Sequence, residues 1–184
     1  MPLFYGIKTP IVEQLRIDYS LLSTLPIEPV PQDCLHITLV YVGKSRVKAE
    51  AILEIERNLS QIPKFRIIAG PEIDLFPSIS KPRALVLKVQ DPTKSLMKLR
   101  NLIMTILNKH NVKIEDRYTR EFKPHITLGH IRAKMDYNAA VELLETAQDL
   151  FKNFKIEITV DRVELIDSTG GTYKVVQYYP LFSS

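Results

Sequence analysis

The sequence predicts an α+β fold in which two similar antiparallel-sheet lobes, with helices on the outside, face each other across a central cleft. The first observation is a repeated phrase, His-Ile-Thr-Leu, at residues 36–39 and again at 125–128. The second is a rough strand–helix–strand order that occurs twice, with one copy of the phrase in each half. The third is that many strand connections are short turns, which join antiparallel strands rather than parallel ones. The chain 1–184 is therefore expected to be a single bilobal domain.

The first quarter of the chain is predicted to contain a strand, a helix and a second strand. The strand covers Leu3 to Lys8. Thr9-Pro10 resembles a helix cap followed by proline at the first helical position, and apolar residues then recur at helical spacing to about Thr24. Three prolines between positions 26 and 31 make the next segment irregular, because proline lacks a backbone donor. That segment leads to the strand that carries His36 and ends at Gly43.

The middle of the chain is predicted to form a helix, a hairpin and another helix. The helix covers 47–60, and strands at 65–69 and 73–76 are separated by a bend or bulge at Gly70-Pro71. A proline-rich turn at 76–83 joins them to an alternating strand at 85–89. Asp91-Pro92 then caps a helix with an apolar stripe that runs to about His110-Asn111.

The last third begins with a loop at 113–123 that leads directly into the second phrase. Asp136 is expected to cap a helix that continues through Phe151. A strand follows at 154–160, and the alternation of apolar residues changes parity after Asp161-Arg162, which indicates a bulge or a break. A glycine turn at 167–171 precedes the last strand, Tyr173 to Tyr179.

Composition indicates an ordinary globular protein and favours no special class. Charged residues make up 25% of the chain and the formal net charge is +4, which permits an anionic partner without requiring one. The single cysteine, Cys34, excludes an internal disulfide and indicates a reducing compartment; a buried bystander role is favoured over a nucleophile paired with His36. No apolar run approaches eighteen residues and no signal peptide is evident. A cytoplasmic protein without membrane association is expected.

The repeated phrase puts its polar side chains on one face of a strand and its apolar side chains on the other. Side chains alternate along a strand, so His36 and Thr38 share one face, as do His125 and Thr127. One strand histidine is more often structural, but a repeat with the same hydroxyl partner favours a functional site. A metal site needs three or four ligands, and the other histidines are poorly placed: His110 is near a helix end, and His130 is on the opposite strand face by parity.

Metal-free phosphoryl transfer accounts for every polar residue of the phrase. Breaking a phosphodiester requires one group to deprotonate the attacking oxygen and another to protonate the departing one, and two imidazoles can do both. Hydroxyl donors are suited to the nonbridging oxygens of the transition state. Two His-x-Thr motifs on opposite sides of one phosphate would supply this set.

Several further motifs give the chain a resemblance to a known family. The matching segments are Phe4 in the first strand, 35–39 with Gly43, Phe76-Pro77 with Pro82-Arg83, 122–128, and Ser168 with 171–173. Together with the two His-x-Thr motifs, they resemble the RNA 2′,3′-cyclic phosphodiesterase branch of the 2H phosphoesterase superfamily, historically called the 2′-5′ RNA ligase family. The resemblance extends over nearly the whole chain.

The resemblance implies a bilobal fold with a basic groove that acts on RNA ends carrying a 2′,3′-cyclic phosphate. Neither a metal nor another cofactor is expected. Hydrolysis would leave a 2′-phosphate, and by analogy His125 would activate water while His36 protonates the departing 3′-oxygen. An RNA 5′-hydroxyl in place of water would give 2′-5′ ligation by the same mechanism. The expected partners are tRNA halves or oligonucleotides with cyclic phosphate ends, and the protein is expected to be a monomer.

Two departures from the family pattern concern the charge that balances the phosphate. The family usually has arginine where this chain has His130, and often arginine where it has Pro2. Arg132 is a candidate substitute if Gly129 forms a bulge. The residues expected to hold RNA through phosphate contacts are Lys44, Arg46, Lys81, Arg83, Arg117, Arg120 and Arg132, together with His130. The aromatic residues that could stack on a terminal base are Phe4, Tyr5, Tyr41 and Tyr173.

Two alternative functions remain open from the sequence. One is a binding module that keeps the cleft for a nucleotide or RNA end without turnover. The other is a phosphodiesterase for small cyclic nucleotides or 2′-5′ oligonucleotides, which would differ from the RNA-end enzyme only in its substrate.

Overall fold

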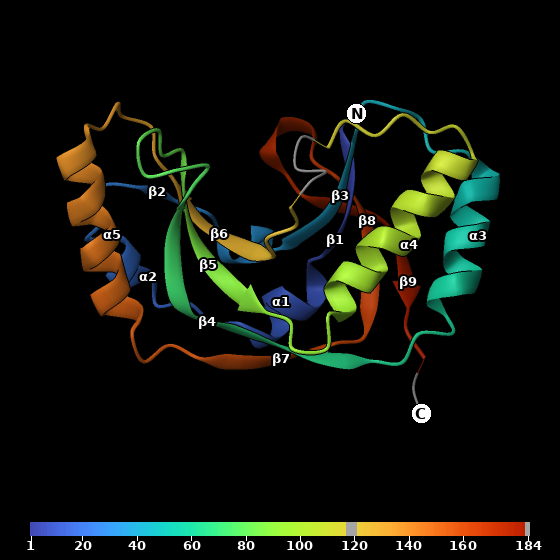
Figure 1. Cartoon of the computed structure of the whole chain (residues 1–184), viewed down its shortest axis with the longest axis horizontal. Helices are drawn as coiled ribbons and strands as arrows, with labels where there is room; N and C mark the ends of the chain where they lie inside the picture. Colours follow the sequence, from blue (N-terminus) through green and yellow to red (C-terminus); the bar gives the residue numbers. More distant parts are fainter. Residues whose placement is uncertain (117–120, 183–184) are drawn as a thin grey trace.

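A computed structural model describes residues 1–116 and 121–182 of the chain. It contains two antiparallel sheets side by side, with helices on the outer sides of both (Figure 1). One sheet, called sheet A below, has the strand order β3-β1-β8-β9, and the other, sheet B, has the order β2-β6-β5-β4-β7. The predicted α+β class with two antiparallel lobes is confirmed.

The elements have the following bounds. Sheet A contains β1 (Leu3–Ile7), β3 (Ile37–Gly43), β8 (Arg162–Asp167) and β9 (Lys174–Pro180). Sheet B contains β2 (Glu28–Pro29), β4 (Phe65–Phe76), β5 (Ala84–Gln90), β6 (His125–His130) and β7 (Ile156–Val160). The helices are α1 (Thr9–Gln14), α2 (Tyr19–Leu22), α3 (Ala49–Leu59), α4 (Ser95–Lys109) and α5 (Tyr137–Phe151), with 3-10 turns η1 (Gln32–Cys34) and η2 (Thr169–Gly171).

The three long helices cover the outer faces of the sheets. Helices α3 and α4 pack on each other, and they contact β9 and β3 of sheet A, respectively, whereas α5 packs on β4 of sheet B (Figure 1). Each helix buries an apolar stripe, such as Ala51, Ile55 and Leu59 of α3. The predicted cap at Asp136 is confirmed, because its carboxylate accepts the Ala139 N–H at 2.9 Å. Helix α4 begins later than predicted, with Lys94 at the capping position, but the Asp91 carboxylate still caps it by accepting the Ser95 N–H at 2.8 Å.

Neither lobe is a continuous half of the chain. Sheet A combines β1 and β3 with β8 and β9 from the other end of the chain. Helix α1 follows a strand of sheet A but contacts β7 of sheet B, and α4 follows a strand of sheet B but packs on β3 of sheet A. The predicted change of parity after Asp161 is a break, because β7 belongs to sheet B and β8 to sheet A.

The prediction of one helix from Thr9 to Thr24 is wrong, because the segment forms two short helices. Helix α1 ends at Gln14, and the backbone of Leu15 is extended. The Gln32 amide accepts the Ile17 N–H at 3.4 Å and donates to the Leu15 carbonyl, which stabilises the extended connection. The Asp18 carboxylate then caps α2 by accepting the Ser20 N–H at 2.9 Å.

The predicted cap at Thr9 is also wrong. Lys8 occupies the capping position of α1, and the carboxylate that accepts its N–H belongs to Glu164 of β8. The segment predicted to be irregular contains β2, where Glu28 and Pro29 pair with the edge of β6. Proline is tolerated there because one side of an edge strand needs no donor. At Gly70-Pro71, β4 continues to Phe76 with a register irregularity, which confirms the predicted bulge.

Candidate active site

The two His-x-Thr motifs come from different sheets and meet where β3 contacts β6. His36 directly precedes β3 and His125 is the first residue of β6. In Figure 1 these two strands run near each other in the middle of the molecule, between the helices of the two lobes. The predicted alternation is confirmed: the aliphatic residues of both phrases are fully buried, while the histidines and threonines are only half-buried.

Both strands contain a β-bulge at the leucine of the phrase. In sheet A, Gly6 pairs with Thr38 and the adjacent Tyr5 pairs with Val40, so Leu39 is an extra residue in β3. In sheet B, Val86 pairs with Thr127 and Leu85 pairs with Gly129, so Leu128 is the extra residue in β6. An extra residue of this kind shifts the parity of everything that follows it.

The two bulges bring a second pair of residues to the cleft faces. Tyr41 pairs with Phe4 in sheet A, and His130 pairs with Ala84 in sheet B. Each of them lies five residues after the histidine of its motif and on the same face of the sheet as that histidine. The prediction that His130 lies on the face opposite His125 is therefore wrong, because strict alternation ends at Leu128. Arg132 lies beyond the end of β6, where its exposed side chain bonds to Glu28.

Each catalytic candidate imidazole is held by the same local contact. Nδ1 of His36 lies 2.7 Å from the Cys34 carbonyl, and Nδ1 of His125 lies 2.7 Å from the Lys123 carbonyl. A carbonyl only accepts, so Nδ1 carries the proton in both rings. No hydrogen bond among the described residues occupies either Nε2. Nε2 is thus the nitrogen that each ring presents for proton transfer.

Aromatic rings fix the two imidazoles from behind. The His36 ring centroid is 4.9 Å from that of Phe4 and 4.6 Å from that of Tyr173. The His125 centroid is 4.5 Å from that of Phe76. Phe76 was not predicted as a site residue, although the core positions of Ile73 and Leu75 put it on the cleft face of β4.

These contacts change the predicted roles of two aromatic residues. Phe4 is only 2% exposed and packs against His36, so its ring supports the imidazole and leaves no face for a base. Tyr5 is fully buried in the core and does not reach the cleft. Tyr173 remains half-buried, and Tyr41 is 36% exposed on the cleft face.

Burial lowers the pKa of both imidazoles, and neighbouring positive charges lower that of His36 further. The pKa of His36 is lowered to about 4, and burial is the largest cause. The hydrogen bond to the Cys34 carbonyl raises this pKa, whereas the charges of His125, Lys8 and His130 lower it further. Burial also lowers the pKa of His125, and the Lys123 carbonyl opposes the shift. In the free protein both rings are therefore neutral at pH 7, and groups from both sheets act on His36 at close range.

A cavity of about 780 Å³ opens beside Thr38 and His125. Its apolar lining consists of Leu39, Leu75, Phe76, Pro77, Ile79, Ala84, Phe122 and Leu144. Its polar lining consists of Ser78 and the charged residues Asp74, Arg83, Arg100, Asp116, Glu121 and Lys123. The volume and the mixture of apolar walls with a few charges are those of a small-molecule site and suit a nucleoside.

An ion pair between Arg100 and Asp116 forms part of the cavity wall. The Arg100 guanidinium donates to Asp116 Oδ2 at 2.7 Å and to the carbonyl of Leu39, the bulge residue of β3. It also lies 5.1 Å from the ring centroid of Phe122, which precedes the second motif. Arg100 was not predicted, although a charged residue within the apolar stripe of α4 was a visible signal.

The predicted cations are distributed unevenly. Arg83 is exposed and lines the cavity. Lys44, Arg46 and Lys81 are exposed, and none of them lines that cavity. Arg117 and Arg120 lie outside the described residues. Within the described part of the chain, no group of three or more His, Cys, Asp or Glu side chains is arranged to hold a metal ion, and no helix has the length and apolar character to cross a membrane.

Comparisons with known proteins agree with this geometry. The family model of the 2′-5′ RNA ligase superfamily matches residues 8–172. The chain is 27% identical over 157 residues to the RNA 2′,3′-cyclic phosphodiesterase of Aeropyrum pernix, covering 83% of this chain and 85% of that protein. Among solved structures, TT0787 of Thermus thermophilus has a TM-score of 0.68 at 20% identity, covering 98% of both chains. LigT of E. coli, complexed with 3′-AMP, has a TM-score of 0.64 at 20% identity, covering 100% of both. The resemblance is thus confirmed, and this chain belongs to the 2′-5′ RNA ligase superfamily of 2H phosphoesterases.

Proposed function

We propose that the protein hydrolyses 2′,3′-cyclic phosphate ends of RNA to 2′-phosphates without a metal ion. The observation that carries the proposal is the matched pair His36 and His125, one from each sheet, each with Nδ1 bonded to a carbonyl and Nε2 presented to the cleft. A diester cleavage needs one proton acceptor and one proton donor, and this pair supplies both.

The reaction divides between the two motifs. In the reactive form His36 is protonated and His125 is neutral. His125 takes a proton from water as the water oxygen bonds to phosphorus, and His36 gives its Nε2 proton to the 3′-oxygen as its bond to phosphorus breaks. The product keeps the phosphate on the 2′-oxygen. Thr38 and Thr127 donate hydroxyl hydrogens to the nonbridging oxygens, which carry more charge in the transition state. Ligation is the same reaction with an RNA 5′-hydroxyl in place of water.

The cavity beside Thr38 and His125 suits the nucleoside that carries the cyclic phosphate. Arg83 at its rim and Tyr41 on the cleft face are the surface groups best placed for the RNA on either side. Phosphate contacts from arginine carry no sequence readout, so an RNA end of varied sequence is the expected substrate. The Aeropyrum pernix relative is named for this activity, which supports the proposal.

The direct test is an RNA oligonucleotide ending in a 2′,3′-cyclic phosphate, incubated with the protein and EDTA. The expected product is the 2′-phosphate, identified by its resistance to a 3′-specific phosphatase and by mass. Activity that disappears in EDTA and returns with a divalent ion would contradict the proposal. Tight binding with recovery of intact substrate would instead support a binding module.

The size of the preferred substrate distinguishes an enzyme for RNA ends from a phosphodiesterase for small cyclic nucleotides or 2′-5′ oligonucleotides. The 780 Å³ cavity accommodates a nucleoside, whereas RNA beyond it would lie along the exposed rim. A cyclic-phosphate dinucleotide and a tRNA half are therefore compared by kcat/KM. A higher value for the tRNA half is expected, and a preference for the dinucleotide or a small cyclic nucleotide would indicate the narrower function.

The pH dependence follows from the lowered pKa values of the two histidines. Proton transfer needs one neutral and one protonated ring, and kcat/KM reports ionisation of the free enzyme. The acidic limb is expected near pH 4, where His36 titrates, and the alkaline limb below the ordinary histidine value of 6.5, since the pKa of His125 is also lowered. A pH series of kcat/KM tests this, and an optimum above pH 7 would contradict it.

We also propose that residues 1–184 act as one monomeric unit in the cytoplasm. The two histidines come from different sheets, so neither lobe alone has the site. Cys34 as the single cysteine favours a reducing compartment. Light scattering of the purified protein tests the monomer, and fractionation of cells tests the location.

A further inference from the structure

The strand register of sheet A places a lysine directly beside His36. Ile7 of β1 and Ile37 of β3 form the last pair of the two strands, and Lys8 and His36 are the residues that lie directly beyond it. The pair Gly6 and Thr38 precedes them on the same face. Alternation along the two strands continues the face of Gly6 and Thr38 to Lys8 and His36, and the charge of Lys8 acts on the His36 ring.

Lys8 is half-buried, and none of the ion pairs within the described residues uses its ammonium group. The nearby carboxylate of Glu164 accepts three hydrogen bonds from neutral donors. It accepts the backbone N–H of Lys8 at 2.6 Å, that of Thr9 at 2.9 Å, and the Thr9 hydroxyl. A half-buried ammonium with no carboxylate partner needs an anion or water to compensate its lost hydration.

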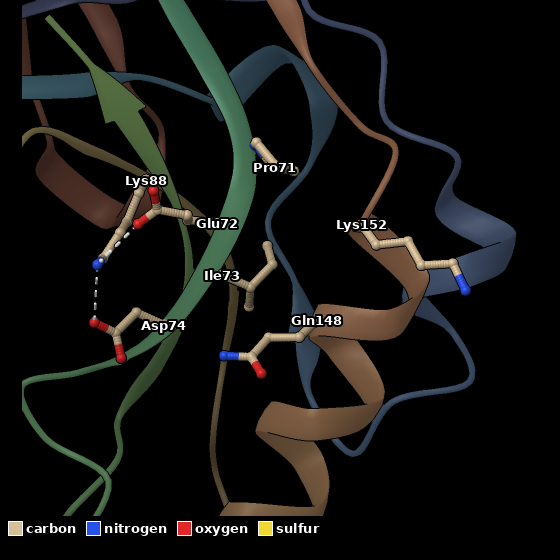
Figure 2. Close-up of a pocket in the computed structure, with 7 residues that line it drawn as sticks. All are labelled: Pro71, Glu72, Ile73, Asp74, Lys88, Gln148 and Lys152. Carbon is tan, nitrogen blue, oxygen red and sulfur yellow. Dashed lines mark hydrogen bonds and ion pairs between the residues drawn. The ribbon is translucent and has the colours of Figure 1, made fainter.

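Sheet B provides a contrast at the equivalent position. Lys88 pairs with His125, as Lys8 is opposite His36. Its ammonium, however, lies 3.2 Å from Glu72 and 3.9 Å from Asp74, and Figure 2 shows it turned toward these two carboxylates. Figure 2 also shows Gln148 and Lys152 of α5 on the other side of β4, and the second cavity, of about 430 Å³, has neither His36 nor His125 in its lining. Lys88 thus forms ion pairs with two carboxylates, whereas Lys8 forms none within the described residues.

We propose that Lys8 binds a nonbridging oxygen of the substrate phosphate beside His36 and supplies the fixed positive charge that His130 does not. Position 130 holds a histidine, whereas the lysine at position 8 ends in a compact ammonium that binds phosphate as a point charge. The charge of Lys8 is one of the causes that lower the pKa of His36, which agrees with their proximity. The inference rests on the proposed function, because it assigns a residue to the same phosphate.

Other groups around His36 do not replace this charge. His125 and His130 face it from β6, and Tyr173 and Phe4 pack on its ring. The Cys34 thiol lies on the same side, and burial and the charge of Asp33 raise its pKa. Among these neighbours, Lys8 is the one with a side chain that ends in an ammonium group.

The test compares Lys8→Met with Lys8→Arg, and uses Lys98→Met as a control that makes the same charge change on the exposed surface of α4. Inorganic phosphate is titrated into each protein, and binding is followed by the NMR signal of the His36 ring. A charge-assisted hydrogen bond to phosphate accounts for about 10- to 100-fold in affinity. Lys8→Met is expected to lose about that factor, Lys8→Arg less than about 5-fold, and Lys98→Met nothing.

The same spectra provide a second readout, which is used only if the other ring signals keep their folded chemical shifts, because unfolding would also raise the lowered pKa of His36. Removing a neighbouring positive charge should raise the pKa of His36 in Lys8→Met and leave it in place in Lys8→Arg. In turnover of cyclic-phosphate RNA, kcat/KM should fall by a similar factor, about 10- to 100-fold, in Lys8→Met. Wild-type phosphate affinity and an unchanged His36 pKa in that variant would overturn the assignment.

The binding and activity results also separate this inference from the proposed function. A protein that does not hydrolyse cyclic-phosphate RNA, but whose phosphate affinity depends on Lys8, would support the anion site and overturn the function. An active protein in which Lys8→Met retains full activity and full phosphate affinity would support the function and overturn the role of Lys8.

Discussion

Replacing His125 or His36 by alanine is expected to lower kcat by a factor of about 10²–10⁴ in either case. Each ring presents Nε2 because its Nδ1 donates to a backbone carbonyl at 2.7 Å, and alanine removes the imidazole that exchanges a proton on that side of the phosphate. Single-turnover hydrolysis of a cyclic-phosphate RNA measures the chemical step directly. His110→Ala is the matched control, because that histidine bonds to Glu54 between α3 and α4, away from the cleft.

The double variant His36→Ala/His125→Ala distinguishes joint from independent action. If the two rings act on the same phosphate in one transition state, losing the second should add little to losing the first. Strictly additive losses would argue against a joint role. Melting temperatures close to that of the wild type are needed in all three variants, so that the loss of rate is not a loss of fold.

The elements with strong local patterns were predictable from the sequence. The apolar stripes of α3, α4 and α5 and the hairpin of β4 and β5 follow from periodicity, because each element buries one face against a neighbour. The pairing of the two histidines was also predictable, since the same phrase repeats on two strands. The family match to residues 8–172 agrees with the resemblance of the motifs.

The features that were mispredicted depend on partners far away in the sequence. The helix from Thr9 to Thr24 is interrupted because Gln32 bonds to the backbone of the connection between α1 and α2. The cap of α1 is Glu164, which no local pattern could reveal. The position of His130 depends on a bulge at Leu128, and a bulge is a mismatch between two strands that one strand alone does not encode.

Replacing Arg100 by methionine is expected to lower the free energy of unfolding by about 3 kcal/mol, because breaking a buried ion pair leaves a buried charge behind. Arg100 is 4% exposed, and its guanidinium donates to Asp116 Oδ2 at 2.7 Å. Methionine fills most of the aliphatic volume but provides neither charge nor donor. Urea unfolding followed by circular dichroism measures the loss.

The partner substitution tests whether the buried charge is the cause. In Arg100→Met/Asp116→Asn the carboxylate is replaced by a neutral amide that can still accept from the Tyr41 N–H, so the double variant should recover more than half of the lost stability. A double variant as unstable as the sum of the two single ones would contradict this account. Activity provides a separate readout, because Arg100 also donates to the Leu39 carbonyl next to Thr38. We therefore expect kcat to stay reduced after stability is restored, since the donor that holds the bulge of β3 is still missing.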